Sequence, residues 1–131
     1  HIFGEAVKKI GDVDLIVCGA KSDMGFSGQT GPRLAEYLNI PHITQVNSIE
    51  LDDNKISLGY LDGLNRTVNF PALITVNPDV AQPKLPNALN IIKAFKKEIL
   101  QWSLSDLNMD QSFAGAGASK VTVRSQFLSE Q

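Results

Sequence analysis

Hydrophobic and polar positions in the first forty residues switch between helical and strand spacing. Apolar residues recur at helical intervals over residues 2–10 and stop at Gly11, which predicts an amphipathic helix. Residues 14–19 carry a continuous apolar run that ends in glycine, as expected for a strand buried on both faces of a parallel sheet. A small, polar stretch follows, and helical spacing resumes over residues 32–39. This part of the chain therefore predicts a helix, a strand, a loop and a second helix.

The middle of the chain changes to strand-like patterns. Polar turns separate residues 49–51, 56–61 and 64–70, which predicts an antiparallel meander. Residues 71–76 form another apolar run and predict a second buried strand. Before the meander, residues 43–48 alternate, so two sets of side chains are expected on opposite faces: Ile43, Gln45 and Asn47 on one, and Thr44, Val46 and Ser48 on the other.

The last third of the chain is predicted to be less regular. Residues 77–86 contain three prolines and indicate an exposed loop. Residues 88–95 have an apolar face at helical spacing, with lysines toward the C-terminal end, where cations suit the helix dipole. We expect an edge strand at residues 99–102 and a short helical turn at residues 103–107.

These patterns predict one domain and a tail. Residues 1–107 predict a single α/β domain with a mainly parallel sheet and a meander insertion. Residues 108–131 are predicted to be an extended C-terminal arm, because apolar positions in residues 112–131 are too scattered to build a core. Since the chain opens at His1 rather than Met, we expect it to be a piece of a longer protein.

Composition excludes several classes of protein. The 131 residues carry 12 Lys+Arg against 14 Asp+Glu, and no basic stripe of the kind that binds nucleic acid. No apolar run approaches the ~18 residues that cross a bilayer, so an integral membrane protein is not expected. The single cysteine, Cys18, has no disulfide partner, and with only His1 and His42 as histidines we expect no metal site.

The loop before the second helix is the strongest candidate for chemistry. It follows the C-terminal end of a buried strand, where parallel sheets bind ligands, and it opens a helix. Gly28 and Gly31 allow a close backbone approach, Pro32 suits the first helical turn, and the N–H groups of that turn can bind a phosphate. Among the polar side chains of this loop, Ser22 and Asp23 could hydrogen-bond a ribose or the edge of an adenine. Ser27, Gln29 and Thr30 could hydrogen-bond a phosphate.

A purely structural interpretation stays open for each candidate. Thr30 can merely cap a helix while the glycines shape a turn, because the spacing is neither a Walker nor a dinucleotide fingerprint. His42 is interpreted as a surface or hydrogen-bonded residue, Cys18 as inert, and Trp102 as a packing anchor. The proline-bearing loop is either a connector or a docking element with Val80 at its tip.

Several segments, taken together, resemble the C-terminal portion of the beta subunit of an electron transfer flavoprotein. The most specific is the run Gly28-Gln29-Thr30-Gly31-Pro32 after an apolar strand. Residues 102–107 are similar to the branch of the family linked to carnitine metabolism and nitrogen fixation. Residues 14–41 resemble the family's nucleotide-binding strand, loop and helix, and residues 70–76 resemble its second strand. Residues 83–86 resemble its partner-recognition loop, and residues 92–97 resemble its lysine-bearing helix.

The resemblance implies a fold, a cofactor and partners. The fold is an adenine-nucleotide-binding, Rossmann-like α/β fold of three layers, here without its N-terminal strands. The partners are a flavin-bearing alpha subunit and an acyl-CoA-type or other flavin dehydrogenase, docked through Val80. The role is electron carriage without bond-making catalysis, in a prokaryotic cytoplasm rather than a mitochondrial matrix. The ligand is AMP, or the ADP part of a FAD shared with the alpha subunit, held by Gly19, Ala20, Lys21, Ser22, Asp23, Ser27, Gly28, Gln29, Thr30 and Gly31.

Two other functions stay open. An adenine-nucleotide sensor or ATP-binding module would use the same loop for phosphates and need no flavin partner. An assembly domain would use residues 112–131 to wrap a neighbouring molecule. The resemblance also departs from the family at residues 24–27, where acidic residues are usual. Because the resemblance leaves out the other wall of the site, we expect this chain alone to bind nucleotide weakly or not at all.

Overall fold

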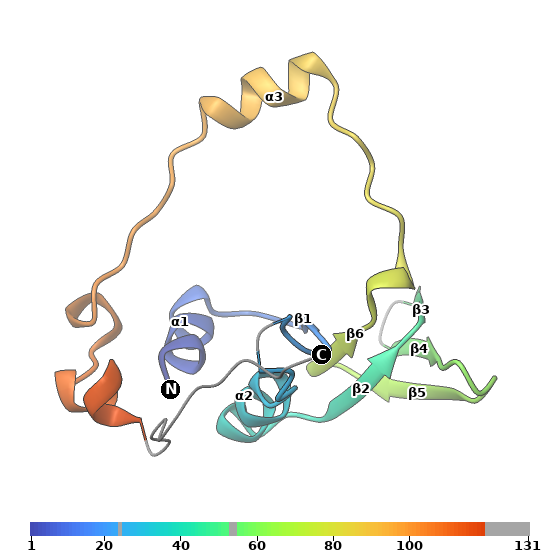
Figure 1. The fold of residues 1–131 in the computed structure, drawn as a ribbon, viewed down its shortest axis with the longest axis horizontal. Helices are drawn as coiled ribbons and strands as arrows, with labels where there is room; N and C mark the ends of the chain where they lie inside the picture. Colours follow the sequence, from blue (N-terminus) through green and yellow to red (C-terminus); the bar gives the residue numbers. More distant parts are fainter. Residues whose placement is uncertain (24, 53–54, 120–131) are drawn as a thin grey trace, which may run out of the picture.

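The computed structural model describes residues 1–23, 25–52 and 55–119 of the chain (Figure 1). The end of the predicted tail, residues 120–131, lies outside the described residues. The helices are α1 (Ile2–Ile10), α2 (Thr30–Leu38) and α3 (Ala88–Phe95). The strands are β1 (Leu15–Gly19), β2 (His42–Val46), β3 (Ser48–Asp52), β4 (Lys55–Gly59), β5 (Asn65–Asn69) and β6 (Ala72–Val76). Single 3₁₀ turns follow at η1 (Pro78–Val80), η2 (Ser105–Leu107), η3 (Gln111–Phe113) and η4 (Ala116–Ala118).

The strands form two sheets of different kinds. The first is parallel, in the order β1-β6-β2, with Leu15 opposite Ala72 and Ile43 opposite Ile74. The second is the antiparallel meander β3-β4-β5. The predicted α/β class, the parallel sheet and the meander are therefore confirmed, while the Rossmann-like arrangement of three layers stays a prediction.

The parallel sheet is covered differently on its two faces. On one face Leu73 packs against Leu34 and Ala35 of α2, and these three side chains are almost completely buried. On the other face Ile74 packs against Ile56 and Leu58 of the meander, all with no exposed surface. The meander therefore completes the core, because it covers apolar strand residues that would otherwise face water.

Strand β2 departs from the predicted alternation. Ile43 and Val46 are both buried in the same cluster, although strict alternation would place them on opposite faces. The register against β6 shifts between these two residues, and Gln45 has a φ of 55°. The irregularity adds a residue to one strand and returns Val46 to the core, so the predicted division of this segment into two faces is wrong.

Strand β1 is less buried than predicted. Ile16 and Cys18 pack toward α2 and Leu15 toward the meander, but Val17 is 54% exposed. In the part of the chain that the structure describes, β1 pairs with β6 alone and forms one edge of the sheet. The expectation of a strand buried on both faces is therefore wrong at Val17, because no described element covers this side chain on its face of the sheet.

Helix α1 packs beside α2 through a close contact. Gly4 lies directly against the ring of Tyr37, where even one added methyl group would overlap it. The Tyr37 hydroxyl donates to Glu5 Oε1 at 2.6 Å, and Lys8 Nζ donates to the same oxygen at 2.8 Å. Both predicted helices are confirmed, although α2 begins at Thr30 rather than at residue 32.

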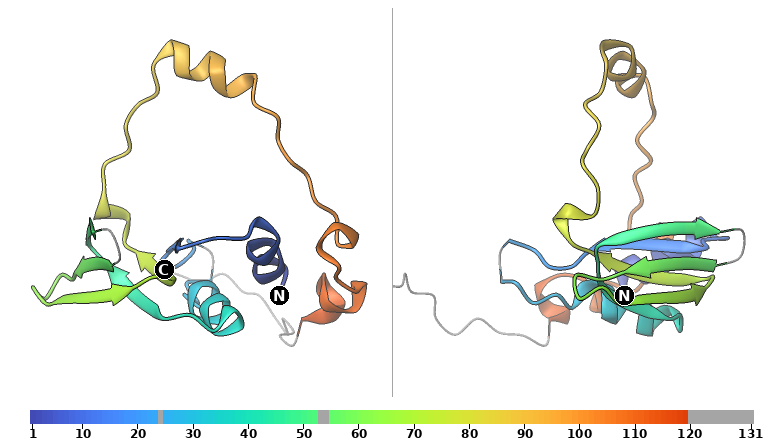
Figure 2. Two further views of the ribbon diagram at one scale, coloured as in Figure 1. Left: turned by 180° about the vertical axis from the view of Figure 1, so that it is seen from behind. Right: turned by 90° about the vertical axis from the view of Figure 1, so that its right-hand side faces the viewer.

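Residues 81–103 leave the body of the molecule and return to it, and we call this segment the arch. Figures 1 and 2 show α3 at its outermost part, joined to the body by extended chain on both sides. All residues of the arch are exposed, including Leu85 at 94% and Phe95 at 87%. The predicted edge strand at residues 99–102 is wrong, because this part of the arch lies away from both sheets and has no strand to pair with.

The chain after the arch returns to α1. The predicted turn at residues 103–107 is confirmed by η2, and Leu107 is buried there at 7% exposure. The division into a domain at residues 1–107 and an arm at 108–131 stays a prediction, although η3 and η4 show short turns in the described part of that arm. No helix among the described residues is long and apolar enough to span a membrane.

Candidate functional site

The predicted binding loop begins where the parallel strands end. Strands β1, β2 and β6 run in the same direction, so their C-terminal ends share one edge of the sheet. The Ala20 amide donates to the carbonyl oxygen of Val76 at 3.0 Å, which extends the pairing of β1 with β6 by one residue. The loop of residues 20–29 is thus fixed at its start to the edge at which parallel sheets bind ligands.

The two ends of the loop lie close together. Gly28 has a φ of 59°, and a Cβ at this position would lie 3.1 Å from the Ala20 carbonyl oxygen. A side chain is therefore disfavoured at Gly28 by both its backbone conformation and the nearby carbonyl. Between these ends, Lys21 Nζ lies 5.3 Å from the ring centroid of Phe26, whose φ is 44°. The two ends of the loop thus approach each other, and Gly28 leaves its backbone open to a close approach.

Helix α2 begins at this loop without a side-chain cap. Its first residue is Thr30 and its N-cap is Gln29, whose side chain makes no capping hydrogen bond. The interpretation of Thr30 as a helix cap is therefore wrong, because Thr30 already lies inside the helix. The first turn contains no acidic residue. Its amides, which have no carbonyl partner within the helix, are available to an anion at the positive end of the helix dipole.

Gly31 seats the first turn of α2 on the sheet. A Cβ there would overlap Thr75 Cγ2 and lie 3.3 Å from Leu73 Cδ2 and 3.4 Å from His42 Nε2. Only glycine lets the helix start this close to β6. The role of Gly31 is therefore to seat the start of α2 on the sheet, where the sequence suggested only general backbone freedom.

The polar side chains of the loop remain accessible to a ligand. Gly28 is partly buried and Gly31 is buried, so these two glycines serve through the backbone. The exposed side chains, all carried by the predicted loop or by the start of α2, are those of Lys21, Ser22, Asp23, Ser27, Gln29 and Thr30. Their assignment to an adenine nucleotide stays a prediction.

A group of amides at the same sheet edge was not selected from the sequence. Asn77 directly follows β6, and its Nδ2 donates to Asn47 Oδ1 at 2.5 Å and to the Gln45 carbonyl oxygen at 3.4 Å. The Asn77 backbone amide donates to the Val46 carbonyl oxygen at 3.1 Å. These bonds tie the end of β6 to the end of β2 and border the site. In the sequence, the position of Asn77 directly after a buried parallel strand could have indicated that it lies at this edge.

His42 and Cys18 lie against the packing between α2 and the parallel sheet. His42 Nε2 is buried and has no hydrogen-bond partner among the described residues, so the expectation of a surface or hydrogen-bonded residue is wrong for this nitrogen. Burial lowers the pKa of His42 below its ordinary value, which favours the neutral imidazole. Burial raises the pKa of the Cys18 thiol, which keeps it protonated and agrees with an inert cysteine.

Val80 is not at the tip of a loop. It ends η1, directly after β6, and is partly buried, whereas the outermost part of the chain is α3 (Figure 1). Its role in docking stays a prediction, but the exposed apolar side chains lie farther along the arch. The large ones are Leu85, Leu89, Ile91, Ile92, Phe95, Ile99, Leu100 and Trp102.

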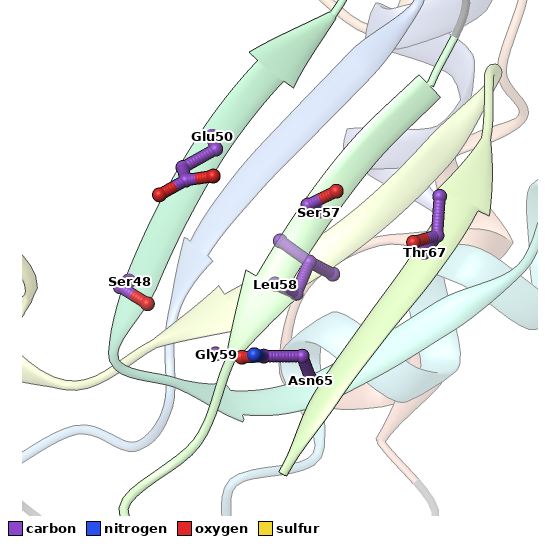
Figure 3. Close-up of a pocket in the computed structure, with 7 residues that line it drawn as sticks. All are labelled: Ser48, Glu50, Ser57, Leu58, Gly59, Asn65 and Thr67. Atoms are coloured by element: carbon purple, nitrogen blue, oxygen red, sulfur yellow. The ribbon is translucent and has the colours of Figure 1, made fainter. Parts of the chain in front are cut away.

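A hollow lies on the outer face of the meander, away from the predicted loop residues. It has a volume of about 220 Å³, and Figure 3 shows its polar side chains spread over the three strands of the meander. At Gly59 the side chains of Ser48 and Asn65 come so close that an added Cβ would overlap Ser48 Oγ and lie 3.2 Å from Asn65 Oδ1. None of the loop residues lines this hollow. Among the described residues no group of three or more metal-ligating side chains is found.

Comparisons with known proteins identify a family and several relatives of this chain. Residues 1–107 match the family described as electron transfer flavoprotein domain. The chain is 29% identical over 133 aligned residues to the electron transfer flavoprotein subunit beta of Clostridium acetobutylicum, covering 99% of this chain and 51% of the relative. The same subunit of Megasphaera elsdenii is 30% identical over 143 residues, which cover 100% of this chain and 52% of the relative.

A third relative belongs to a named enzyme complex. The caffeyl-CoA reductase-Etf complex subunit CarD of Acetobacterium woodii is 27% identical over 124 residues, which cover 92% of this chain and 47% of the relative. The chain therefore spans about half the length of the curated relatives it matches.

Proposed function

Since this chain belongs to the electron transfer flavoprotein domain family, we propose that it carries part of the nucleotide site of an electron transfer flavoprotein beta subunit. In this proposal it binds AMP, or the ADP part of a FAD, at residues 19–31. It pairs with a flavin-bearing alpha subunit and passes electrons between dehydrogenases and an acceptor. The relatives that carry the beta-subunit name support this assignment.

The single observation that carries the proposal is the uncapped start of α2 at the C-terminal edge of the parallel sheet. A phosphate there would accept hydrogen bonds from first-turn amides that have no helical partner, and the helix dipole would favour its negative charge. The residues fit such a group, because the first turn has no acidic side chain and Gln29 does not cap it. Thr30 and Ser27 are exposed and can add hydroxyl hydrogen bonds.

The residues of this chain bind and orient the nucleotide rather than break bonds. A flavin, when bound, supplies the electron-transfer chemistry, and the protein supplies position and electrostatics. Gly28 and Gly31 allow the backbone contacts, while Lys21 places a positive charge on the loop. The residues in this loop include no evident nucleophile paired with a base, which is consistent with a carrier.

The arch is proposed to dock the flavin dehydrogenase. Large apolar side chains are exposed along it, and such side chains on the surface of a single chain mark sites of protein contact. The arch also carries four lysines against a single acidic residue, Glu98. Its partner surface is therefore expected to be apolar with acidic residues around it.

The open edge of β1 is proposed to pair with a strand from the rest of the beta subunit. The curated relatives are about twice as long as the matching chain, so they hold enough residues for further strands. Val17 is exposed on this edge strand, and the side chains of another parallel strand would pack beside it. The same strands would complete the second wall of the nucleotide site. The bacterial relatives support a prokaryotic, cytoplasmic location.

The proposal is tested by co-expressing the subunit with an electron transfer flavoprotein alpha subunit. The purified complex is denatured, and the released FAD and AMP are quantified per heterodimer. One FAD with one AMP supports a simple carrier, and two FAD support a bifurcating one. A complex without flavin contradicts electron carriage and favours the adenine-nucleotide sensor.

A further inference from the structure

The returning end of the arch is held by a side chain of α1. Lys9, near the end of α1, donates from Nζ to the Asp106 carbonyl oxygen at 2.6 Å. The same ammonium lies 5.3 Å from the centroid of the Trp102 ring. Lys9 thus bonds to η2 across 97 positions of sequence and also makes a cation–π contact with the last part of the arch.

The segment that Lys9 holds has a fixed shape of its own. The Asp106 carboxylate accepts from the Ser103 amide at 2.8 Å and from the Ser103 hydroxyl at 2.6 Å. Leu107 is buried, and its amide donates to the Leu104 carbonyl oxygen at 3.2 Å. The carbonyl group that faces Lys9 is therefore already in position, so a single cation can fix the whole turn.

We propose that Lys9 is a positioning residue that latches the returning end of the arch onto α1. With both ends fixed, the apolar residues around α3 are presented as a closed arch instead of a free tail. Fixing the arch in advance reduces the ordering cost that a partner must overcome on binding. This inference rests on the proposed docking of a flavin dehydrogenase by the arch.

The neighbouring lysine provides a matched control. Lys8 bonds to Glu5 at 2.8 Å and lies over the Tyr37 ring at 4.6 Å, so its contacts are with α1 and α2. Lys8 and Lys9 are both exposed, and both belong to the last turn of α1. Lys9→Met and Lys8→Met therefore each remove one positive charge from the same helix and leave an unbranched side chain. Only Lys9→Met removes the latch. Lys9→Arg should restore it, since a guanidinium keeps both contacts.

The latch itself is tested without any partner. Trp102 is the single tryptophan of the chain, so tryptophan fluorescence reports on the surroundings of this residue. We expect Lys9→Met to increase acrylamide quenching of Trp102 and to accelerate amide hydrogen exchange at residues 107–109 about tenfold. Lys8→Met and Lys9→Arg should leave both near the wild-type values. Unchanged quenching and exchange in Lys9→Met would overturn the latch.

Its role in docking is tested in the heterodimer. An acyl-CoA dehydrogenase is the probe, and its affinity for the heterodimer is measured by surface plasmon resonance. We expect Lys9→Met to weaken binding several-fold, mainly through slower association, and Lys8→Met to have no such effect. A loosened turn with unchanged affinity would overturn the positioning role. Failure of the unmodified heterodimer to bind the probe would instead count against the proposed docking, and the fluorescence and exchange results would still decide the latch.

Discussion

Gly31 in the first turn of α2 lies directly against the side chain of Thr75 in β6, so no Cβ can be accommodated between them. This contact joins the N-terminal end of α2, which is proposed to bind an anion, to the central strand of the parallel sheet. It also places His42 Nε2 below the same turn. The position of the first turn of α2 therefore depends on the side chains of Thr75 and His42, which lie beneath it.

Replacing Gly31 with alanine should displace the start of α2. The added methyl group overlaps Thr75, and overpacking of this kind costs about 1–3 kcal/mol of stability. The shifted turn should also weaken nucleotide binding by the heterodimer. A loss of about 1.4 kcal/mol in binding free energy corresponds to a tenfold lower affinity. Urea unfolding and quantification of bound nucleotide measure the two effects.

Gly117→Ala is the matched control for that substitution. Gly117 has no atom within 4 Å of an added Cβ, so its replacement should change stability by less than about 0.5 kcal/mol. If both variants behave alike, the close contact between Gly31 and Thr75 does not position the helix.

Replacing Thr75 with valine should leave a backbone amide without a partner. Thr75 is 3% exposed, and its Oγ1 accepts a hydrogen bond from the Gln45 amide at 3.2 Å at the irregularity in β2. Valine keeps the shape but removes the acceptor of this part-buried hydrogen bond, which should cost about 0.5–1.5 kcal/mol. Thr75→Ser keeps the oxygen and should retain this bond. Equal unfolding free energies for the valine variant and the wild type would contradict the prediction.

His42 should make the folded state less stable in mild acid. Burial lowers its pKa in the folded protein below the ordinary 6.5 that the unfolded chain has. Between these two pKa values the unfolded state binds more protons, so the free energy of unfolding falls as the pH drops from near neutral. His42→Gln should remove this part of the pH dependence.

The measurement is a series of urea unfolding curves for both proteins across this pH range. An NMR titration of the wild type then identifies the His42 resonance by its loss in the variant. A His42 that titrates at or above the ordinary histidine pKa would show that the imidazole is not desolvated beneath α2.

Substitutions in the arch should affect docking without affecting stability. Phe95 is 87% exposed and Leu85 is 94% exposed, so Phe95→Ser and Leu85→Ser should change the free energy of unfolding by less than about 0.5 kcal/mol. If these side chains anchor a dehydrogenase, each should weaken its binding to the heterodimer by about tenfold or more. Calorimetric titration measures the affinity, and thermal unfolding serves as the control.

Val80→Ala compares the sequence-based docking candidate with the arch. Val80 lies at the foot of the arch and is partly buried, so this substitution should reduce stability more than docking. A larger loss of docking at Val80 than at Phe95 would favour the sequence-based assignment over the exposed arch.

Local patterns were sufficient for most of the elements. The helical spacing of residues 2–10 and the run of residues 14–19 are confirmed as α1 and β1, because their periodicity matches the elements they form. The prediction of an edge strand at residues 99–102 was wrong because a strand needs a neighbouring strand, and no local pattern indicates whether one is present. Alternation failed in β2 because Gln45 departs from extended backbone to bond with Thr75, which lies 30 positions away in sequence.

By itself the sequence determined the helices, the strands, the meander and the loop that opens α2, since these depend on spacing and turn residues within short segments. Only the tertiary structure decided that Gly31 sits on Thr75, that Gln29 leaves the helix uncapped, and that Lys9 meets Trp102. These relationships join residues that lie far apart along the chain or depend on one local conformation. They arise from packing between elements, which composition and periodicity do not specify.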